Sequence, residues 1–197
     1  MKEQDLIWEP VKTEHIVRDK WIDFRRMAYR LPDGTVFEPF YNYSRRSYVV
    51  VVPSDPEGNY LCVRQFRHGI GQVTTEFPAG GIERSGDADY AAPEDKASRA
   101  EATLETAKRE LLEETGYTSE AWTHLLTVPS NATISDNYAH LYLARNCRRV
   151  SGLRLDDTEF LDVVRLSPAE IDGLIEREQF QQAMHILAWL LVKGREA

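Results

Sequence analysis

The chain has 197 residues, of which 42% are hydrophobic and 28% are charged. These values are ordinary for a globular protein with one substantial core, and they argue against intrinsic disorder. The net charge of −8 argues against a dominant role on nucleic acids or on a membrane surface, because both favour basic proteins.

The first ten residues are charged and lack the apolar core of a signal peptide. No apolar run approaches the roughly 20 residues that a membrane-spanning helix requires. Cys62 lies in the apolar run Tyr60 to Val63 and is expected to be a buried free thiol, and neither it nor Cys147 has a second cysteine at metal-ligand spacing. These features predict a cytoplasmic protein without a disulfide framework.

Residues 1–45 are predicted to form a small antiparallel sheet that precedes the main domain, residues 46–197. Short mixed runs alternate with turn signals in this segment. Leu31-Pro32-Asp33-Gly34 is a typical turn, and Thr35 to Tyr41 is rich in β-branched and aromatic residues.

The main domain alternates strand-like apolar runs with helical patterns, which favours an α/β or α+β sandwich. The predicted strands are 48–52, 60–66, 74–78, 121–128, 140–144 and 160–166. Ser98 stands three residues before Glu101, which is the spacing of a capping box, and predicts a helix that runs to about Glu114 with Gly116 as its stop. Two further helices are predicted at 168–176 and 180–192.

The end of the first helix carries three carboxylates. Glu110 and Glu114 stack on one face of a helix with 3.6 residues per turn, and Glu113 lies one residue away. Anions in the last turn oppose the helix dipole, and such a local conflict is expected at a functional site. Oxygen ligands suit Mg²⁺ or Mn²⁺, although an acidic solvated helix face is the ordinary interpretation of a Glu-Glu pair alone.

The segment Arg109-Glu110-Leu111-Leu112-Glu113-Glu114-Thr115-Gly116, with Glu101 eight residues upstream of Arg109, resembles the Nudix box. This resemblance implies a Nudix-type α/β/α sandwich with a mixed sheet. It assigns Glu110 and Glu114 as metal ligands and Glu113 as a further ligand or proton acceptor. The box expects a glycine six residues before its first glutamate, whereas Gly80 and Gly81 precede Glu101 by far more. Glu101, at the first acidic position of the box, is a further candidate metal ligand. We interpret 86–99 as an inserted loop, so Glu83 or Asp87 competes with Glu101 for this position.

Around the box, Val63-Arg64-Gln65-Phe66-Arg67 and Glu76-Phe77-Pro78-Ala79-Gly80 are similar to segments of the ADP-ribose pyrophosphatase branch of the family. The resemblance implies that the Ala79 carbonyl binds a metal and that Arg67 contacts substrate phosphate. Glu76, Gly80 and Gly81 are candidates for the same substrate site, since glycines let the backbone approach a ligand closely.

The acidic loop at 156–159 is where this branch commonly places a further metal ligand or the catalytic base, which makes Asp157 and Glu159 candidates beside Glu113. A solvated turn is the alternative for this loop. His140 is expected to be a structural histidine rather than a base.

The expected activity is Mg²⁺-dependent hydrolysis of the pyrophosphate bond of a nucleoside diphosphate sugar, with ADP-ribose giving AMP and ribose 5-phosphate. The branch often has Pro-Gly where this chain has Asn131-Ala132, which leaves GDP-mannose or another nucleotide sugar as an alternative. A second alternative is a nucleotide-binding module without catalysis.

The branch also uses its N-terminal sheet in a homodimer, where Trp21, Tyr41 and Tyr43 could pack or stack on adenine.

Overall fold

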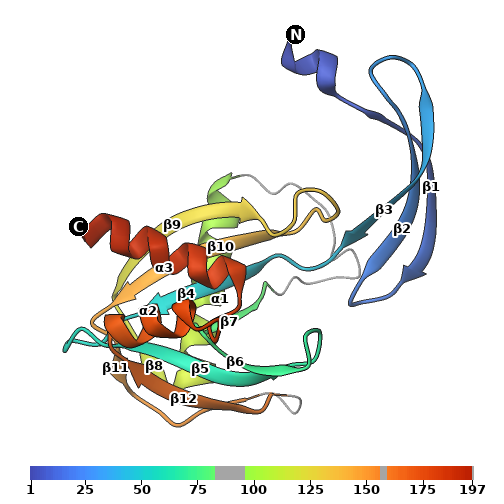
Figure 1. Ribbon diagram of the computed structural model, residues 1–197. Coiled ribbons are helices and arrows are strands. Elements are labelled where there is room, and N and C mark those ends of the chain that lie inside the picture. The colour runs from blue at the N-terminus through green and yellow to red at the C-terminus, as the bar shows by residue number, and fades with distance from the viewer. Residues whose placement is uncertain (83–95, 156–158, 197) are drawn as a thin grey trace. The chain divides into compact units, whose positions relative to one another are not determined.

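A computed structural model of the protein describes residues 1–82, 96–155 and 159–196 (Figure 1). Within these ranges the chain divides into two compact units. The first contains residues 1–46 and 129–138, and the second contains the rest.

The first unit is built on a three-stranded antiparallel sheet of β1 (Glu9–Arg18), β2 (Asp23–Arg30) and β3 (Val36–Ser44), which follow the short 3-10 helix η1 (Glu3–Leu6). The turn between β2 and β3 falls where Leu31-Pro32-Asp33-Gly34 predicted it, and Gly34 adopts a φ of 87°, a left-handed conformation that suits glycine. All ten residues of β1 are exposed within this unit.

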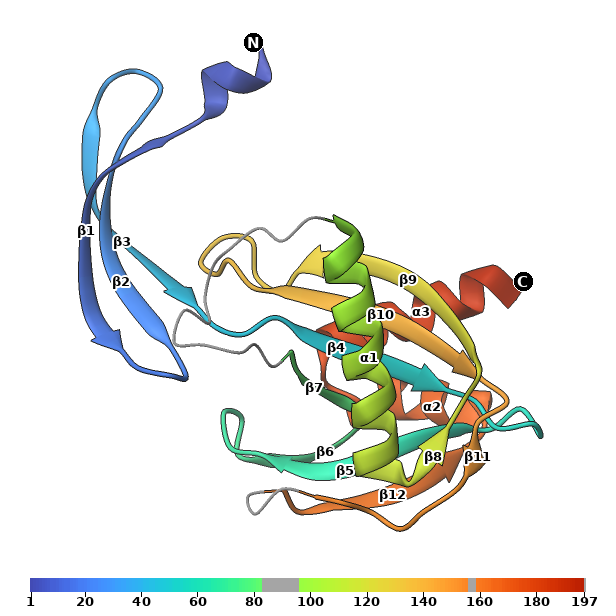
Figure 2. The same cartoon turned by 180° about the vertical axis from the view of Figure 1, so that it is seen from behind.

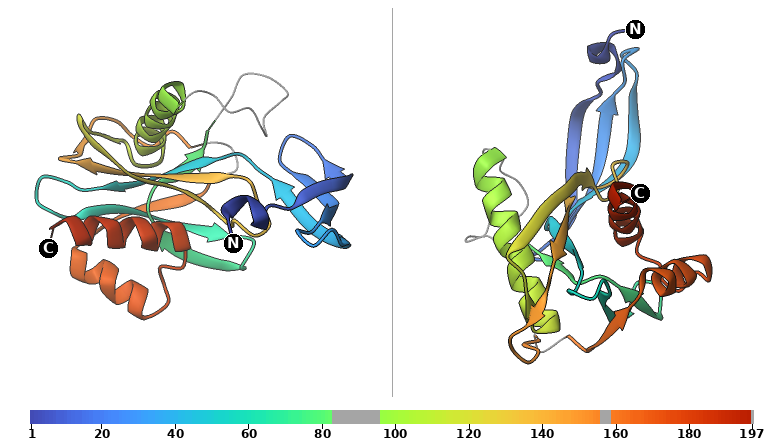
Figure 3. Two further views of the ribbon diagram at one scale, coloured as in Figure 1. Left: turned by 90° about the horizontal axis from the view of Figure 1, so that it is seen from above. Right: turned by 90° about the vertical axis from the view of Figure 1, so that its left-hand side faces the viewer.

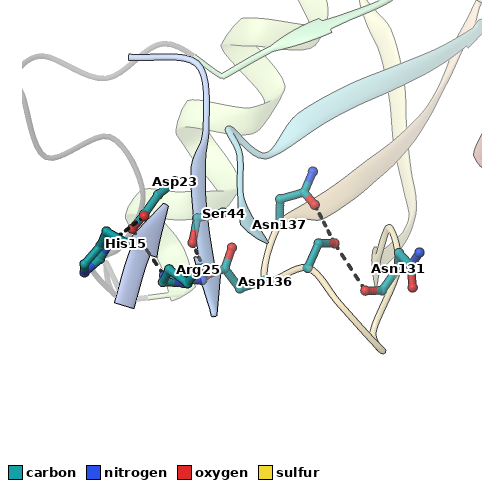
Figure 4. A network of polar contacts seen from close by, with 8 residues as sticks. His15, Asp23, Arg25, Ser44, Asn131, Asp136 and Asn137 are labelled. Carbon is teal, nitrogen blue, oxygen red and sulfur yellow. Dashed lines mark hydrogen bonds and ion pairs between the residues drawn. The ribbon is translucent and has the colours of Figure 1, made fainter. Parts of the chain in front are cut away.

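Residues 129–138 are joined to this sheet by polar contacts (Figure 4). Arg25 donates to Asp23 and Asp136, and the Ser44 hydroxyl also donates to Asp136. His15 Nδ1 lies 2.6 Å from the other Asp23 oxygen. Because Asp23 is buried, its carboxylate requires these hydrogen-bond partners, and the network therefore fixes the loop on the sheet.

The second unit contains two main sheets. The first is mixed, in the order β7 (Ala79–Gly81), β4 (Tyr48–Pro53), β10 (Tyr138–Arg145) and β9 (Ala121–Pro129), with β4 parallel to β10 and antiparallel to β7. The second is antiparallel, in the order β12 (Leu161–Leu166), β5 (Tyr60–Arg67) and β6 (Gln72–Glu76). A two-residue pairing joins β8 (Tyr117–Thr118) to β11 (Arg148–Arg149).

Helices cover both sides of the mixed sheet in this unit, as Figures 2 and 3 show. Helix α1 (Lys96–Thr115) lies on one side, over a core that includes Val49, Val51 and Leu111. Helices α2 (Pro168–Glu176) and α3 (Ala183–Glu196) lie on the other, over a core built around Phe77 and Trp189. Because the valines of β4 alternate between the two cores, one continuous apolar strand serves both layers. The α/β/α sandwich with a mixed sheet is thereby confirmed.

Some local predictions were wrong. The structure begins α1 at Lys96, so Ser98 lies inside the helix and is not its cap, and residues 96–99 are helical rather than part of a loop. Helix α3 begins at Ala183 instead of 180, because Phe180 is buried against Phe77 before the helix starts. Cys62 and Cys147 are buried free thiols, as predicted for Cys62. Among the described residues, no helix is long and apolar enough to cross a membrane.

Candidate active site

The carboxylate-bearing end of α1 is held in place by the residue that ends it. Gly116 has a φ of 75°, and its N–H donates to the carbonyl of Leu112 at 2.8 Å. A Cβ at this glycine would lie 2.4 Å from the carbonyl oxygen of Ser151. Glycine is therefore required both by the backbone angle and by the space available, and the predicted stop of the helix is confirmed.

Glu110 and Glu114 lie one turn apart on α1 and are both buried. The backbone N–H of Ala79 donates to Glu114 Oε2 at 3.1 Å. Two buried carboxylates thus face β7, Glu114 at Ala79 and Glu110 at Gly80. Buried carboxylates at this spacing repel each other unless a proton or a cation lies between them.

Gly80 makes the closest approach of β7 to the helix. An ideal Cβ at this position would lie 2.0 Å from the carboxyl carbon of Glu110 and 2.1 Å from Glu110 Oε1. Any side chain here would displace the carboxylate. The sequence analysis expected Gly80 to let the backbone approach a ligand, whereas the group that it approaches here is Glu110 of the chain itself.

Arg109 links two carboxylates of α1 to strand β7. Its guanidinium donates to Glu113 Oε2 and to Glu110 Oε1, each at 2.7 Å, and to the Gly81 carbonyl at 3.3 Å. The arginine therefore orients two of the three box carboxylates and ties the helix to β7. The motif contained Arg109, but the sequence alone assigned it no contacts.

The electrostatics of the two buried carboxylates favour a bound cation. Burial raises the pKa of Glu110 to about 7, against the opposing effect of Arg109, while Glu113 and Glu159 add to the increase. Burial and the charge of Glu110 also raise the pKa of Glu114 well above its ordinary value, despite the Ala79 N–H. A divalent cation would relieve both effects, since it compensates two negative charges at once.

The donor set fits a hard divalent cation, because buried carboxylate oxygens and backbone carbonyls are the ligands that such ions prefer. Within the described residues, however, no group of three or more His, Cys, Asp or Glu side chains converges closely enough to form a ready-made metal cage. Arg109 accounts in part for the separation of these carboxylates, because its guanidinium binds both Glu113 and Glu110.

The buried Glu76 forms an ion pair with the partly exposed Arg67 next to β7. Glu76 has no exposed surface, and it accepts hydrogen bonds from Arg67, from Gln65 Nε2 at 2.9 Å and from Thr74 Oγ1 at 2.7 Å. Burial alone would raise the pKa of Glu76, but the Arg67 hydrogen bond and charge outweigh it and keep that pKa low. Glu76 has no free face for substrate and orients Arg67, whose side chain stays 34% exposed.

The other predicted site residues are placed as follows. Glu159 acts electrostatically on both Glu110 and Glu114, so the structure brings it to the same region. Glu101 is exposed on α1, nine residues before Glu110, which is about 13 Å along the helix axis. The structure does not bring Glu101 to the carboxylate pair, because a continuous helix separates Glu101 from Glu110 by about two and a half turns. Asp157, Glu83 and Asp87 lie outside the described residues.

His140 is buried on β10, and its Nδ1 lies 3.0 Å from the Thr127 hydroxyl. The structure thus gives it a protein partner on the neighbouring strand, in line with a structural role. A second buried histidine, His185 of α3, accepts a hydrogen bond from the backbone N–H of Phe77 at 3.1 Å. Nothing in the sequence indicates this contact, since His185 stands in an apolar helix like an ordinary core residue.

Residues 44–190 match the NUDIX domain. This match covers most of the chain, and the chain therefore belongs to the Nudix family and is a Nudix hydrolase.

Within the family the chain resembles ADP-ribose pyrophosphatases. It is 27% identical over 188 residues to the ADP-ribose pyrophosphatase of Bacillus subtilis, covering 95% of this chain and 93% of the relative. It is 25% identical to the methanol dehydrogenase activator of Bacillus methanolicus, again over 95% and 93% of the two chains. The crystal structure of an ADP compounds hydrolase has the same fold, with a TM-score of 0.76, 21% identity and coverage of 96% and 94%.

Proposed function

We propose that this Nudix hydrolase cleaves the pyrophosphate bond of a nucleoside diphosphate sugar with Mg²⁺, or Mn²⁺ in its place. ADP-ribose is the favoured substrate and would give AMP and ribose 5-phosphate. The observation that carries the proposal is the buried pair Glu110 and Glu114 beside Ala79, whose raised pKa values favour a bound cation. Two relatives named ADP-ribose pyrophosphatase support the choice of substrate.

The residues proposed to hold the metal are Glu110, Glu114, Glu113 and the carbonyl of Ala79. When bound, the ion would supply positive charge to the diphosphate and lower the pKa of a water molecule. The protein's part is to keep Glu110 and Glu114 in place, which the Ala79 N–H and Arg109 do. Arg67 is proposed to bind a substrate phosphate, since its guanidinium can meet two phosphate oxygens at once.

The proton of the attacking water needs a carboxylate acceptor. Glu113 and Glu159 are the proposed candidates among the described residues, and Asp157 is proposed on the resemblance alone. Glu113 is half-buried, and it shares the guanidinium of Arg109 with Glu110, which keeps the two carboxyl groups close together. In the balanced reaction, water adds to one phosphorus, the bridging P–O bond breaks, and the water proton passes to the carboxylate.

We also propose that the first unit mediates a homodimer. An aromatic cluster of Trp8, Tyr29, Phe37 and Phe40 lies on its sheet, with ring centroids 5.3 to 6.2 Å apart. Trp8 and Phe37 remain 45% and 52% exposed, and among the described residues of this unit no second layer of structure covers them. A second copy of the chain would supply that layer. Trp21 and Tyr41 are also exposed and stay candidates for packing or for stacking on adenine.

Light scattering tests the dimer. A dimer for the wild type and a monomer for Trp8→Ser would support it, whereas a fully active wild-type monomer would overturn the idea of a site shared between subunits. A cytoplasmic location is proposed with it, because the two buried cysteines are free thiols.

Substrate choice is tested by a side-by-side panel of ADP-ribose, GDP-mannose and ADP-hexoses with Mg²⁺. We expect ADP-ribose to be cleaved best. Better cleavage of GDP-mannose would favour the alternative hydrolase.

The catalytic residues are tested by replacing Glu113 and Glu114 separately with Gln, and near-normal turnover in both variants would refute the assignment.

A further inference from the structure

The segment that joins β6 to β7 is tied to a different element at each residue. Glu76 bonds to Arg67 of β5, the Pro78 carbonyl accepts from Val51 of β4 at 2.9 Å, and Ala79 N–H donates to Glu114 of α1. Phe77 N–H donates to His185 of α3. Four contacts therefore define the path by which the chain reaches the proposed metal ligands.

The contact between Phe77 and His185 is entirely buried. His185 Nδ1 accepts the hydrogen bond at 3.1 Å across 108 residues of sequence. The Phe77 ring has no exposed surface and packs against Phe180 and Trp189, with ring centroids 5.1 and 6.2 Å away. Water cannot replace the histidine at this place, so the orientation of the Phe77 peptide depends on one imidazole nitrogen.

The protonation state of His185 suits this role. Burial lowers the pKa of His185 to about 4, although the carboxylate of Glu76 acts in the opposite direction. The ring is therefore neutral at physiological pH, and Nδ1 is free to accept a hydrogen bond while Nε2 carries the proton.

We propose that His185 is a positioning residue for the metal site: by holding Phe77 N–H, it sets the direction in which Ala79 and Gly80 reach Glu114 and Glu110. The inference rests on the proposed function, because it assumes that these carboxylates bind a divalent cation. It connects helix α3, on one side of the mixed sheet, with the carboxylates of α1 on the other.

The test compares variants that differ only in the acceptor. Leucine at position 185 removes the acceptor, whereas the Oδ1 of asparagine can take the place of Nδ1. Binding of Mn²⁺ alone is measured by electron paramagnetic resonance, so the readout does not depend on turnover. We expect His185→Leu to weaken Mn²⁺ binding roughly tenfold or more and His185→Asn to restore most of it, as for other residues that orient metal ligands.

His140→Leu is the matched control, because His140 is an equally buried histidine bonded to Thr127 instead of to the 76–79 segment. It should lower the melting temperature and leave Mn²⁺ affinity unchanged. Wild-type affinity in a folded His185→Leu variant would overturn the positioning role while the proposed function stands. Absence of Mn²⁺ binding by the wild type would overturn the proposed function and this inference with it.

If His185→Leu does not fold, nuclear magnetic resonance of the wild type decides. Addition of Mg²⁺ should shift the Phe77 amide and the His185 ring nitrogens together with the Ala79 amide, and it should leave the His140 ring unchanged. A shift of Ala79 without any shift of Phe77 or His185 would contradict the proposal.

Discussion

Gly80 and Glu110 are in such close contact that an added Cβ on the glycine would lie 2.0 Å from the glutamate carboxyl carbon. Strand β7 and helix α1 can approach this closely only because position 80 has no side chain. The same approach brings backbone groups of β7 to the buried carboxylates, so the packing of two elements and the formation of the proposed metal site depend on one residue.

Replacing Gly80 with alanine should therefore damage the site more than the fold. We expect turnover to fall by roughly 10²-fold, since displacements of about 1 Å have that effect, and stability to fall by about 1–3 kcal/mol. Gly69→Ala is the control, because a Cβ at Gly69 meets nothing within 4 Å. Activity assays and thermal melts of both variants check this, and equal turnover in the two would contradict it.

Replacing Glu110 with glutamine should stabilise the protein in the absence of metal. Since burial raises the pKa of Glu110 to about 7, the carboxylate is charged at pH 8 in a place that disfavours charge. We expect the metal-free melting temperature to rise by a few degrees. The free energy of stabilisation that saturating Mg²⁺ gives the wild type, about 2.7 kcal/mol at 100 times the Kd, should disappear in the variant. A lower metal-free melting temperature, with the Mg²⁺ effect retained, would contradict the metal site.

The pH dependence of stability should contain a contribution from His185. Its pKa is about 4 in the folded protein and 6.5 in the reference state. Above pH 6.5 both states are neutral and this contribution is constant. As the pH falls from 6.5 towards 4, only the unfolded chain gains the proton, so stability is lost, by roughly 3 kcal/mol in total. Urea unfolding at pH 7 and pH 4.5 should show a smaller loss for His185→Asn, and identical losses would argue against a neutral buried ring.

Replacing Glu76 with glutamine leaves the Arg67 guanidinium without its buried partner. We expect a loss of about 1–3 kcal/mol in the free energy of unfolding, less than for a fully buried pair because Arg67 is 34% exposed, together with a higher KM for substrate because Arg67 is no longer oriented. Glu120→Gln, at an exposed position, is the control and should change stability by less than about 0.5 kcal/mol. A KM equal to that of the wild type would indicate that Arg67 does not contact substrate.

Much of the fold could be predicted because its signals are local. Helix α2 spans the predicted residues 168–176, since Ser167, Pro168 and Glu170 form a capping box with proline in the first turn. Six strands of the main domain were found from their apolar runs, whereas the short strands β7, β8 and β11 were not, and Gly116 ended α1 as expected. The box carboxylates Glu110, Glu113 and Glu114 likewise stand in one continuous motif.

What could not be predicted depends on contacts between distant residues. Glu76 was expected at the substrate, but strand pairing turns it inward onto Arg67 and Gln65, which a single sequence does not reveal. Glu101 was expected beside the metal, but the helix is continuous from Lys96, which keeps Glu101 about two and a half turns away from Glu110. His185 contacts a backbone N–H 108 residues away, and no spacing in the sequence indicates such a partner.

The most direct test of the central proposal is to incubate the purified protein with ADP-ribose and Mg²⁺ and to identify the products. The proposal predicts AMP and ribose 5-phosphate in equal amounts, with no reaction when the metal is chelated and strongly reduced reaction in Glu114→Gln. Release of ADP and free ribose, or intact ADP-ribose under saturating Mg²⁺ and Mn²⁺, would contradict it.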